Sequence, residues 1–173
     1  MYTTYTVQVD EDGNQFWYYG KELSRSDGPA VIFASGDRKW FQYGKLHRLD
    51  GPAIEYRNGR REWYQNGVLH RIDGPAIEDP NGSYKWYLEG KLHRENGPAV
   101  RYADGDQFYY RAGQHHRLDG PAIKLSHGVE RWFINGQELT KEEFNIKTSE
   151  QVVELTMEEI CQALGKTVKI IKG

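Results

Sequence analysis

The chain has 173 residues, which is enough for one ordinary domain or for a short array of repeats. Its formal net charge of −2 lacks the strongly basic surface that general nucleic-acid binding requires, so we exclude that class. The 13% of aromatic residues and the 19 glycines indicate many short strands separated by tight turns.

Targeting signals and membrane segments are not predicted. The chain has a single cysteine, Cys161, so no internal disulfide can form, and a reducing compartment fits best. The first 13 residues have neither the basic nor the apolar region of a signal peptide. No stretch approaches the roughly 18 apolar residues that a membrane span needs. We therefore expect a soluble, cytoplasmic protein that does not contact a membrane.

A strand is predicted over Tyr2–Val9, and a repeat with a period of 23 residues follows from about residue 12 to residue 136. Two series of glycines define the period, since self-similarity at a fixed spacing is typical of repeat architectures. The first series is Gly13, Gly36, Gly59, Gly82, Gly105 and Gly128. The second series precedes Pro-Ala and consists of Gly28, Gly51, Gly74, Gly97 and Gly120.

Each unit is predicted to form a β-hairpin followed by a returning segment. The third unit reads NGRREWYQNGVLHRIDGPAIEDP, in which Asn58-Gly59 suits a two-residue hairpin turn and Gly67 marks a second turn. The proline after each Gly of the second series marks a strand start or a sheet edge. The sequence thus predicts an all-β fold: one elongated antiparallel sheet of six tandem hairpin repeats, in which each repeat contacts its neighbours.

Tryptophan occupies one position of the repeat. The aromatic series at this position is Trp17, Trp40, Trp63, Trp86, Tyr109 and Trp132. We expect these rings to lie beside one another on one face of the sheet and to form most of the core.

A different module, residues 139–173, follows the array of residues 1–138. Thr140 and Glu143 form a capping-box pattern, which predicts a short helical turn over Lys141–Asn145. The remainder is predicted as a small strand-helix-strand unit over Gln151–Leu155, Met157–Leu164 and Thr167–Lys172. The module is interpreted either as a cap on the open sheet edge or as an element for oligomerisation or partner docking.

The period and the phrase W-[YF]-x-x-G-x-L-H-R-x-D-G-P-A resemble the MORN and MORN-variant repeat family. The likeness is greatest to the variant arrays of phage and large DNA virus genomes, and it covers residues 12–136. The resemblance implies a binding or scaffolding module rather than an enzyme. By analogy, it also implies a virus-encoded inhibitor of a host defence component, acting in the host cytoplasm.

One polar pattern recurs in the array. The candidate binding residues in it are His47, Arg48, His70, Arg71, His93, Arg94, His116 and Arg117. Arg25 continues the row with Ser24 in the histidine position, and an Asp or Asn stands two residues after each arginine. In a structural interpretation, each arginine pairs with this Asp and braces the Gly-Pro turn, while each histidine bonds a backbone carbonyl. In a functional interpretation, the arginines and nearby aromatic rings bind a nucleotide or phosphate ligand.

Metal binding and catalysis fit this row poorly. Equivalent histidines of adjacent repeats should lie roughly 10 Å apart, at two strand spacings, whereas zinc–histidine bonds measure about 2 Å. A catalytic site needs unlike groups assembled once, but here the same groups recur. We therefore expect no enzymatic activity, no metal and no cofactor.

Copies that deviate from the repeat point to a partner surface around the fourth and fifth units. Tyr109 replaces tryptophan, His115 replaces the usual leucine and Asn96 replaces aspartate, so Tyr109 and His115 join the candidate binding residues. The predicted function is a non-enzymatic interaction module that binds another macromolecule through an extended repeat face, and the expected partner is a protein. The alternatives are a sponge that sequesters a nucleotide or another phosphorylated small molecule, and a structural component that forms homo-oligomers through the C-terminal module.

Overall fold

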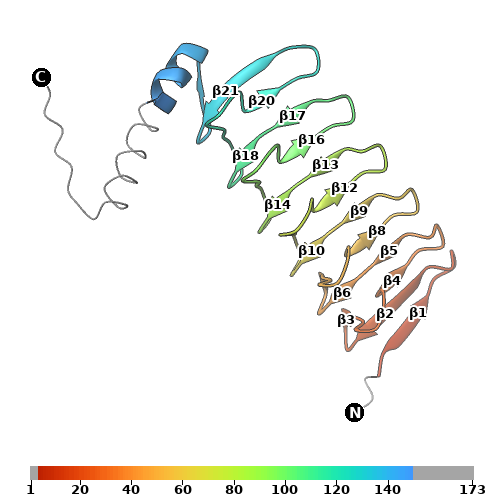
Figure 1. Ribbon diagram of the computed structural model, residues 1–173. Coiled ribbons are helices and arrows are strands. Elements are labelled where there is room, and N and C mark those ends of the chain that lie inside the picture. Colours follow the sequence, from red (N-terminus) through yellow and green to blue (C-terminus); the bar gives the residue numbers. More distant parts are fainter. Residues whose placement is uncertain (1–3, 150–173) are drawn as a thin grey trace, which may run out of the picture.

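The computed structural model describes residues 4–149, and its main feature is one long antiparallel sheet (Figure 1). This sheet has 14 strands, and a single helix follows it in the described part of the chain. The predicted fold class, an all-β array of hairpin repeats with a small helical module, is confirmed. The strand, helix and strand predicted from residue 151 onward lie outside the described residues.

The main sheet runs from one edge to the other through β1 (Thr6–Val9), β2 (Gln15–Tyr19), β4 (Val31–Ile32), β5 (Arg38–Lys39), β8 (Ile54–Glu55), β9 (Arg61–Glu62), β12 (Ile77–Glu78), β13 (Tyr84–Lys85), β16 (Val100–Arg101), β17 (Gln107–Phe108), β20 (Ile123–Lys124), β21 (Glu130–Ile134) and β22 (Gln137–Leu139). The short strand β3 (Glu22–Leu23) pairs with β2 beside this path. Four small two-stranded sheets accompany the main sheet: β6 (Phe41–Gln42) with β7 (Lys45–Leu46), β10 (Tyr64–Gln65) with β11 (Val68–Leu69), β14 (Tyr87–Leu88) with β15 (Lys91–Leu92), and β18 (Tyr110–Arg111) with β19 (Gln114–His115).

Each repeat contains two hairpins with different turns. In the first turn of the second repeat, only Gly36 has a positive φ, 97°, and its N–H donates to the Phe33 carbonyl at 2.8 Å. The Phe33 N–H donates to the Asp37 carbonyl at 2.9 Å, which closes a three-residue loop. The two-residue turn predicted here is therefore wrong, because three residues, 34–36, lie between the bonded pair Phe33 and Asp37. The second turn has two residues with positive φ, 48° at Tyr43 and 73° at Gly44.

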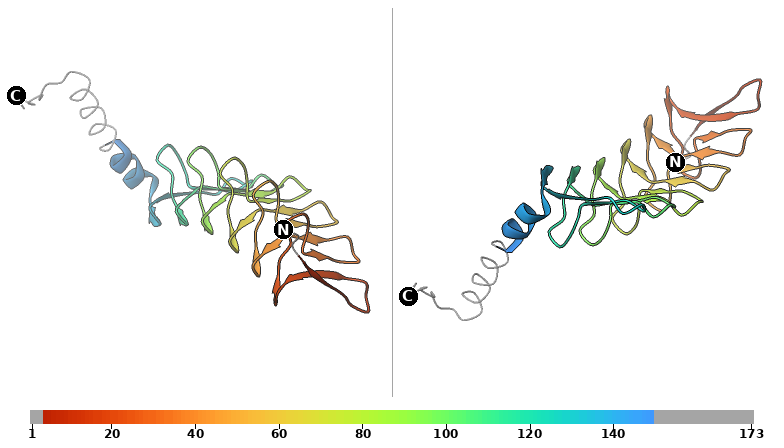
Figure 2. Two further views of the ribbon diagram at one scale, coloured as in Figure 1. Left: turned by 90° about the horizontal axis from the view of Figure 1, so that it is seen from below. Right: turned by 90° about the horizontal axis from the view of Figure 1, so that it is seen from above.

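Backbone hydrogen bonds join every repeat to its neighbours. The Gly67 N–H donates to the Leu46 carbonyl of the preceding small hairpin at 2.8 Å, and the Arg48 N–H donates to the Tyr64 carbonyl of the next repeat at 3.1 Å. Equivalent bonds recur along the array, so a repeat satisfies its backbone through the adjacent copies. The result is a ribbon with the long loops along one margin and the small hairpins along the other, and it twists from end to end (Figures 1 and 2).

The core is a narrow strip of Ala, Val and Ile side chains at the start of those main-sheet strands that follow a Gly-Pro pair. Its buried members in the repeats are Ala30, Val31, Ala53, Ile54, Ala76, Ile77, Ala99, Val100 and Ala122. The five alanines are 0% exposed. They lie where the strand follows the Gly-Pro pair, so the regular Pro-Ala step of the sequence marks the core.

The prediction that the tryptophans form most of the core is wrong. Trp17, Trp40, Trp63, Trp86 and Trp132 are half-buried. The aromatic pairs formed within residues 4–149 include none between two tryptophans. Equivalent residues of adjacent repeats lie two strand spacings, roughly 10 Å, apart, and in four repeats the arginine of the same repeat lies over the tryptophan ring instead.

A helix follows β22 and covers the described residues 141–149, so it is longer than the turn predicted over Lys141–Asn145. The predicted capping box is present: the Thr140 N–H donates to Glu143 Oε2 at 2.8 Å, and the Glu143 N–H donates to Thr140 Oγ1 at 3.2 Å. Phe144 is buried and anchors the helix. Within residues 4–149, no helix has both the length and the apolar character needed to cross a membrane.

The alanine strip leads to a stability prediction. Ala76→Leu adds three carbons at a position without exposed surface, so we expect the free energy of unfolding to fall by about 1–3 kcal/mol. Urea unfolding followed by circular dichroism measures this change. Val68→Leu, at an exposed position, is the control and should change stability by less than about 0.5 kcal/mol. Equal stability of the two variants would contradict this account of the core.

Candidate functional site

The recurring polar pattern forms five phrase loops, one in each of the first five repeats. They are residues 24–29, 47–52, 70–75, 93–98 and 116–121. Each phrase loop joins a second hairpin to the next strand of the main sheet. Because the repeats stack in register, the loops follow one another along one surface of the array.

Each phrase-loop arginine lies over the aromatic ring of its own repeat. The guanidinium carbon is 4.0 to 4.5 Å from the ring centroid in all five loops. Arg117 contacts Tyr109 in this way, so tyrosine replaces tryptophan in the fifth repeat without loss of the contact. A cation over an aromatic face contributes about 0.5–2 kcal/mol, more when it is shielded from water.

The same arginines hold the Gly-Pro turns through hydrogen bonds. In all five loops, arginine Nη1 donates to the proline carbonyl four residues on, at 3.1 to 3.5 Å. In four loops, Nε donates to the Asp two residues on, at 2.7 to 3.1 Å. The structure thus contains the predicted Arg–Asp brace, and the bond from Arg48 lowers the pKa of Asp50. The exception is the fourth loop, where Asn96 replaces aspartate.

The histidines connect neighbouring repeats. His70 Nδ1 accepts the backbone N–H of Glu89 at 3.2 Å, and His116 Nδ1 accepts that of Asn135 at 3.1 Å. His47 and His93 make equivalent bonds, and Ser24 Oγ takes this role in the first repeat. The predicted bond to a backbone carbonyl is wrong, because the group presented by the next repeat is an N–H in its second turn. Nδ1 can accept this N–H only when it carries no proton, so the bond requires neutral histidine.

His115 does not belong to the phrase-loop surface. It lies on β19, where its ring stacks on Tyr110 at a centroid distance of 4.1 Å and lies 5.1 Å from the ring of Phe133. Its Nδ1 is buried and has no hydrogen-bond partner within residues 4–149. Burial lowers the pKa of His115, so the ring stays neutral at neutral pH. Burial, followed by the charge of Arg111, also lowers the pKa of His116.

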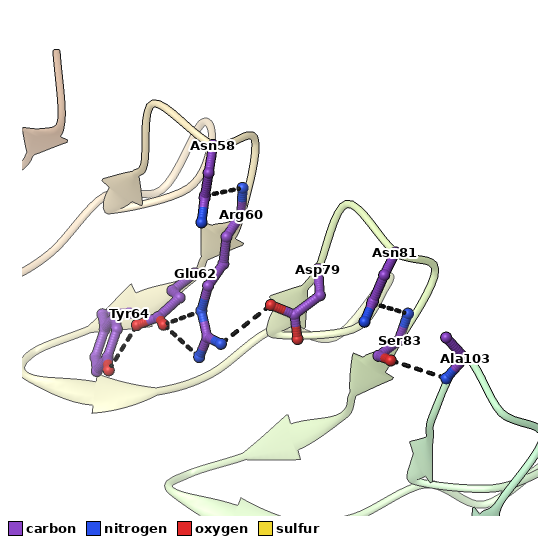
Figure 3. Close-up of polar contacts among 8 residues, drawn as sticks. All are labelled: Asn58, Arg60, Glu62, Tyr64, Asp79, Asn81, Ser83 and Ala103. Carbon is purple, nitrogen blue, oxygen red and sulfur yellow. Dashed lines mark hydrogen bonds and ion pairs between the residues drawn. The ribbon is translucent and has the colours of Figure 1, made fainter.

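A second row of contacts lies at the loops of the main sheet, and our sequence analysis did not identify it. In the fourth repeat, the buried Ser83 accepts the backbone N–H of Ala103, in the loop that leads into the fifth repeat, at 2.9 Å (Figure 3). Asn14, Asp37 and Asp106 make the same bond in their repeats. A short polar residue at one repeat position was the sequence signal for this row.

The third repeat replaces that short side chain with Arg60. Arg60 bonds Glu62 at 2.8 Å and Asp79, beside the loop that leads into the fourth repeat, at 3.0 Å, and the Tyr64 hydroxyl donates to Glu62 at 3.1 Å (Figure 3). Glu62 is only 6% exposed, so these bonds offset the cost of burying its carboxylate. Burial and the charge of Glu62 raise the pKa of Tyr64 to about 12.

Two grooves separate consecutive phrase loops. The larger, about 810 Å³, lies between the first and second loops and brings His47 and Arg48 together with Tyr5, Tyr19 and Tyr43. The smaller, about 330 Å³, lies between the fourth and fifth loops and is lined by Arg94, Tyr109, Arg111, His116, Arg117 and Leu118. His70 and Arg71 occupy the third loop, between these grooves along the array. Within the described residues, no cluster of three or more His, Cys, Asp or Glu side chains could hold a metal ion.

The residue between arginine and aspartate points away from these internal contacts. Leu49 is 76% exposed, Ile72 is 78% exposed and Leu118 is 41% exposed. Leu49 also lines the larger groove and Leu118 the smaller one. Three of the five phrase loops therefore present an apolar side chain outward, while most of their polar groups are bound internally.

Comparison with protein-family models finds none that matches the chain, and comparison with curated proteins finds no match either.

The unpartnered Nδ1 of His115 gives a prediction. His115→Leu restores the leucine of the other repeats, and we expect it to raise the free energy of unfolding by about 1–3 kcal/mol. Because the folded-state pKa of His115 is lowered, its neutral form stabilises the fold above about pH 6.5, and this contribution is lost as the pH falls. The difference between variant and wild type in urea midpoints should therefore widen from pH 8 to pH 5. Leu69→His, the reverse change, should destabilise the protein, and an unchanged midpoint for both variants would refute the assignment.

The ion pair between Arg60 and the buried Glu62 gives another stability prediction. Arg60→Ala leaves a buried carboxylate without its cation, and we expect a loss of about 3 kcal/mol in the free energy of unfolding. The control is Arg61→Ala, an exposed neighbour, which should cost less than about 0.5 kcal/mol. Chemical unfolding at pH 7 compares the two. Similar losses for both variants would mean that Glu62 needs no partner.

Proposed function

We propose that the array is a non-enzymatic protein-interaction module that binds another protein through the phrase-loop surface. One observation carries this proposal: Leu49, Ile72 and Leu118 occupy the same repeat position and lie exposed on consecutive or nearby loops. Exposed apolar side chains gathered on one surface are typical of protein contact sites.

The polar groups of the row favour binding over catalysis. The arginines are engaged by proline carbonyls and, in four loops, by aspartates, while the histidines are engaged by backbone N–H groups. Side chains that make the same internal hydrogen bond in every copy stabilise the repeat fold and are not free to act on a substrate. A nucleophile and a base assembled once would be needed for covalent catalysis.

The resemblance to MORN-variant arrays supports a more specific form of this proposal. Arrays of that kind in viral genomes suggest a virus-encoded inhibitor that binds a host defence component. The module would then act by covering a surface of its target, which requires an extended face rather than an enclosed pocket.

A second candidate function is the sequestration of a nucleotide or another phosphorylated small molecule. The observation that favours it is the larger groove, where Arg25 and Arg48 accompany several aromatic rings that could stack on a base. Against it, the Nε of both arginines already bonds an aspartate, so little positive charge is free for a phosphate.

A third candidate is self-association. It is supported by β1, an edge strand that carries the exposed side chains of Val7 and Val9, because an open edge can pair with another chain. Homo-oligomers through the C-terminal module are the other form of this proposal.

The apolar row can be tested directly. Combining Leu49→Ser, Ile72→Ser and Leu118→Ser removes the exposed side chains, and we expect the retention of a specific partner to fall at least about 100-fold, since each buried apolar side chain contributes about 1.5–3 kcal/mol. Affinity capture from cells of the natural source, quantified by mass spectrometry, measures this. Val7→Ser, Val9→Ser and Val68→Ser form the matched control, which removes three exposed valines elsewhere.

If the row variant and the control retain the partner equally, the proposal is wrong. Native mass spectrometry of the purified protein separates the alternatives. A small mass that is lost on denaturation would favour sequestration, and a mass that grows with concentration would favour self-association.

A further inference from the structure

Arg94 differs from the other phrase-loop arginines in its electrostatic environment. Arg25, Arg48, Arg71 and Arg117 each form an ion pair with the Asp two residues on. Asn96 stands at that place after Arg94. Within residues 4–149, Arg94 forms no ion pair.

A second carboxylate position is also changed in the fourth repeat. Arg48 and Arg71 each bond a glutamate seven residues on, Glu55 at 3.1 Å and Glu78 at 2.8 Å. The equivalent residue after Arg94 is Arg101, which carries the opposite charge. Both acidic partners of the phrase-loop arginine are therefore missing in this repeat.

The guanidinium of Arg94 is nevertheless held in the usual place. It lies 4.2 Å from the centroid of the Trp86 ring, and its Nη1 donates to the Pro98 carbonyl at 3.1 Å and to the Tyr84 hydroxyl at 3.4 Å. Its Nε, which bonds aspartate in the other four loops, has no acceptor among the described residues. The loop backbone also differs, because Gly97 has a φ of 108° while the other glycines that precede proline have no positive φ.

The smaller groove carries the positive charge of Arg94 that no carboxylate balances. Its lining includes three arginines, Arg94, Arg111 and Arg117, and two carboxylates. Asp119 pairs with Arg117 at 2.7 Å, and Glu95 lies 3.7 Å from Arg111 and 3.1 Å from His93. Among the described residues, Arg94 is the arginine of this lining that has no carboxylate partner, so the groove holds one uncompensated positive charge there.

We propose that this groove binds a carboxylate side chain of the protein partner, which bonds Arg94 in the way that aspartate bonds arginine in the other repeats. The proposal rests on the proposed function and names the chemistry of the contact. A carboxylate fits because four copies of this arginine hold one at Nε at 2.7 to 3.1 Å. Leu118, 41% exposed, and Tyr109 provide apolar contact beside it. The matching partner segment is an acidic residue flanked by apolar residues.

The test uses the acetylated and amidated tripeptide Leu-Glu-Leu as the probe and the Nε–Hε signal of Arg94 in nuclear magnetic resonance spectra as the readout. We expect saturable shifts of this signal with the glutamate peptide and none with Leu-Gln-Leu, which has the same shape without the charge. Asn96→Asp supplies the missing carboxylate from within the chain and should weaken peptide binding by at least about tenfold. Asn81→Asp makes the same change of charge in an exposed loop of the fourth repeat and should leave binding unchanged.

Three results would overturn the proposal: no saturable shift, equal shifts with the glutamine peptide, or full binding by the Asn96→Asp variant. Inorganic phosphate that shifts the signal at the same concentration as the peptide would also overturn it, because the groove would then accept any small anion. If the peptide does not bind while substitution of the apolar row still abolishes partner capture, only the proposed carboxylate contact is wrong and the proposed function stands. If the peptide binds while the row substitution changes nothing, the site at Arg94 is real but independent of that surface.

Discussion

The array depends on one contact: the arginine of each phrase loop lies over the aromatic ring of its own repeat. A ribbon one sheet thick cannot bury large side chains on both faces, and its fully buried strip consists mainly of Ala and Val or Ile. The tryptophans, as the largest apolar groups, would remain open to water without a cover. The arginine supplies that cover at 4.0 to 4.5 Å and also binds the proline carbonyl that precedes the next strand. Ring, turn and strand start are thereby held by a single side chain.

The remaining contacts transmit this arrangement from one repeat to the next. Histidine Nδ1 holds the second turn of the following repeat, and short polar side chains such as Ser83 hold its first loop (Figure 3). Each 23-residue unit is too small to satisfy its own backbone, so stability comes from interfaces between copies. The third repeat solves the same problem differently, with an ion pair between Arg60 and Asp79.

Regularity and deviation in the array have different meanings. Groups that recur are bound to the fold, as the Arg–Asp and His–backbone bonds show, and little of their chemistry is left for a ligand. Groups that deviate change what the surface offers. Arg94 lies over Trp86 like its equivalents but has no carboxylate partner among the described residues, and it lines a groove together with the exposed Leu118. Binding specificity in such an array would come from these departures, because the regular repeats present the same surface several times.

The sequence by itself determined the period, the two turns per repeat, the all-β class and the capping box at Thr140, because glycine, proline and capping residues act through local backbone geometry. It also pointed to Asn96 and Tyr109 as departures from the repeat. It did not determine which residues fill the core, since an Ala before Val and a Trp before Tyr both suit a strand. Only the tertiary structure decided that arginine rather than a second ring covers each tryptophan of the first four repeats, that His115 is buried among aromatic rings, and that Arg94 has no acidic partner in the part of the chain that the structure describes. These outcomes depend on the distance and orientation between neighbouring repeats, which backbone hydrogen bonds across the stack set and which no single unit encodes.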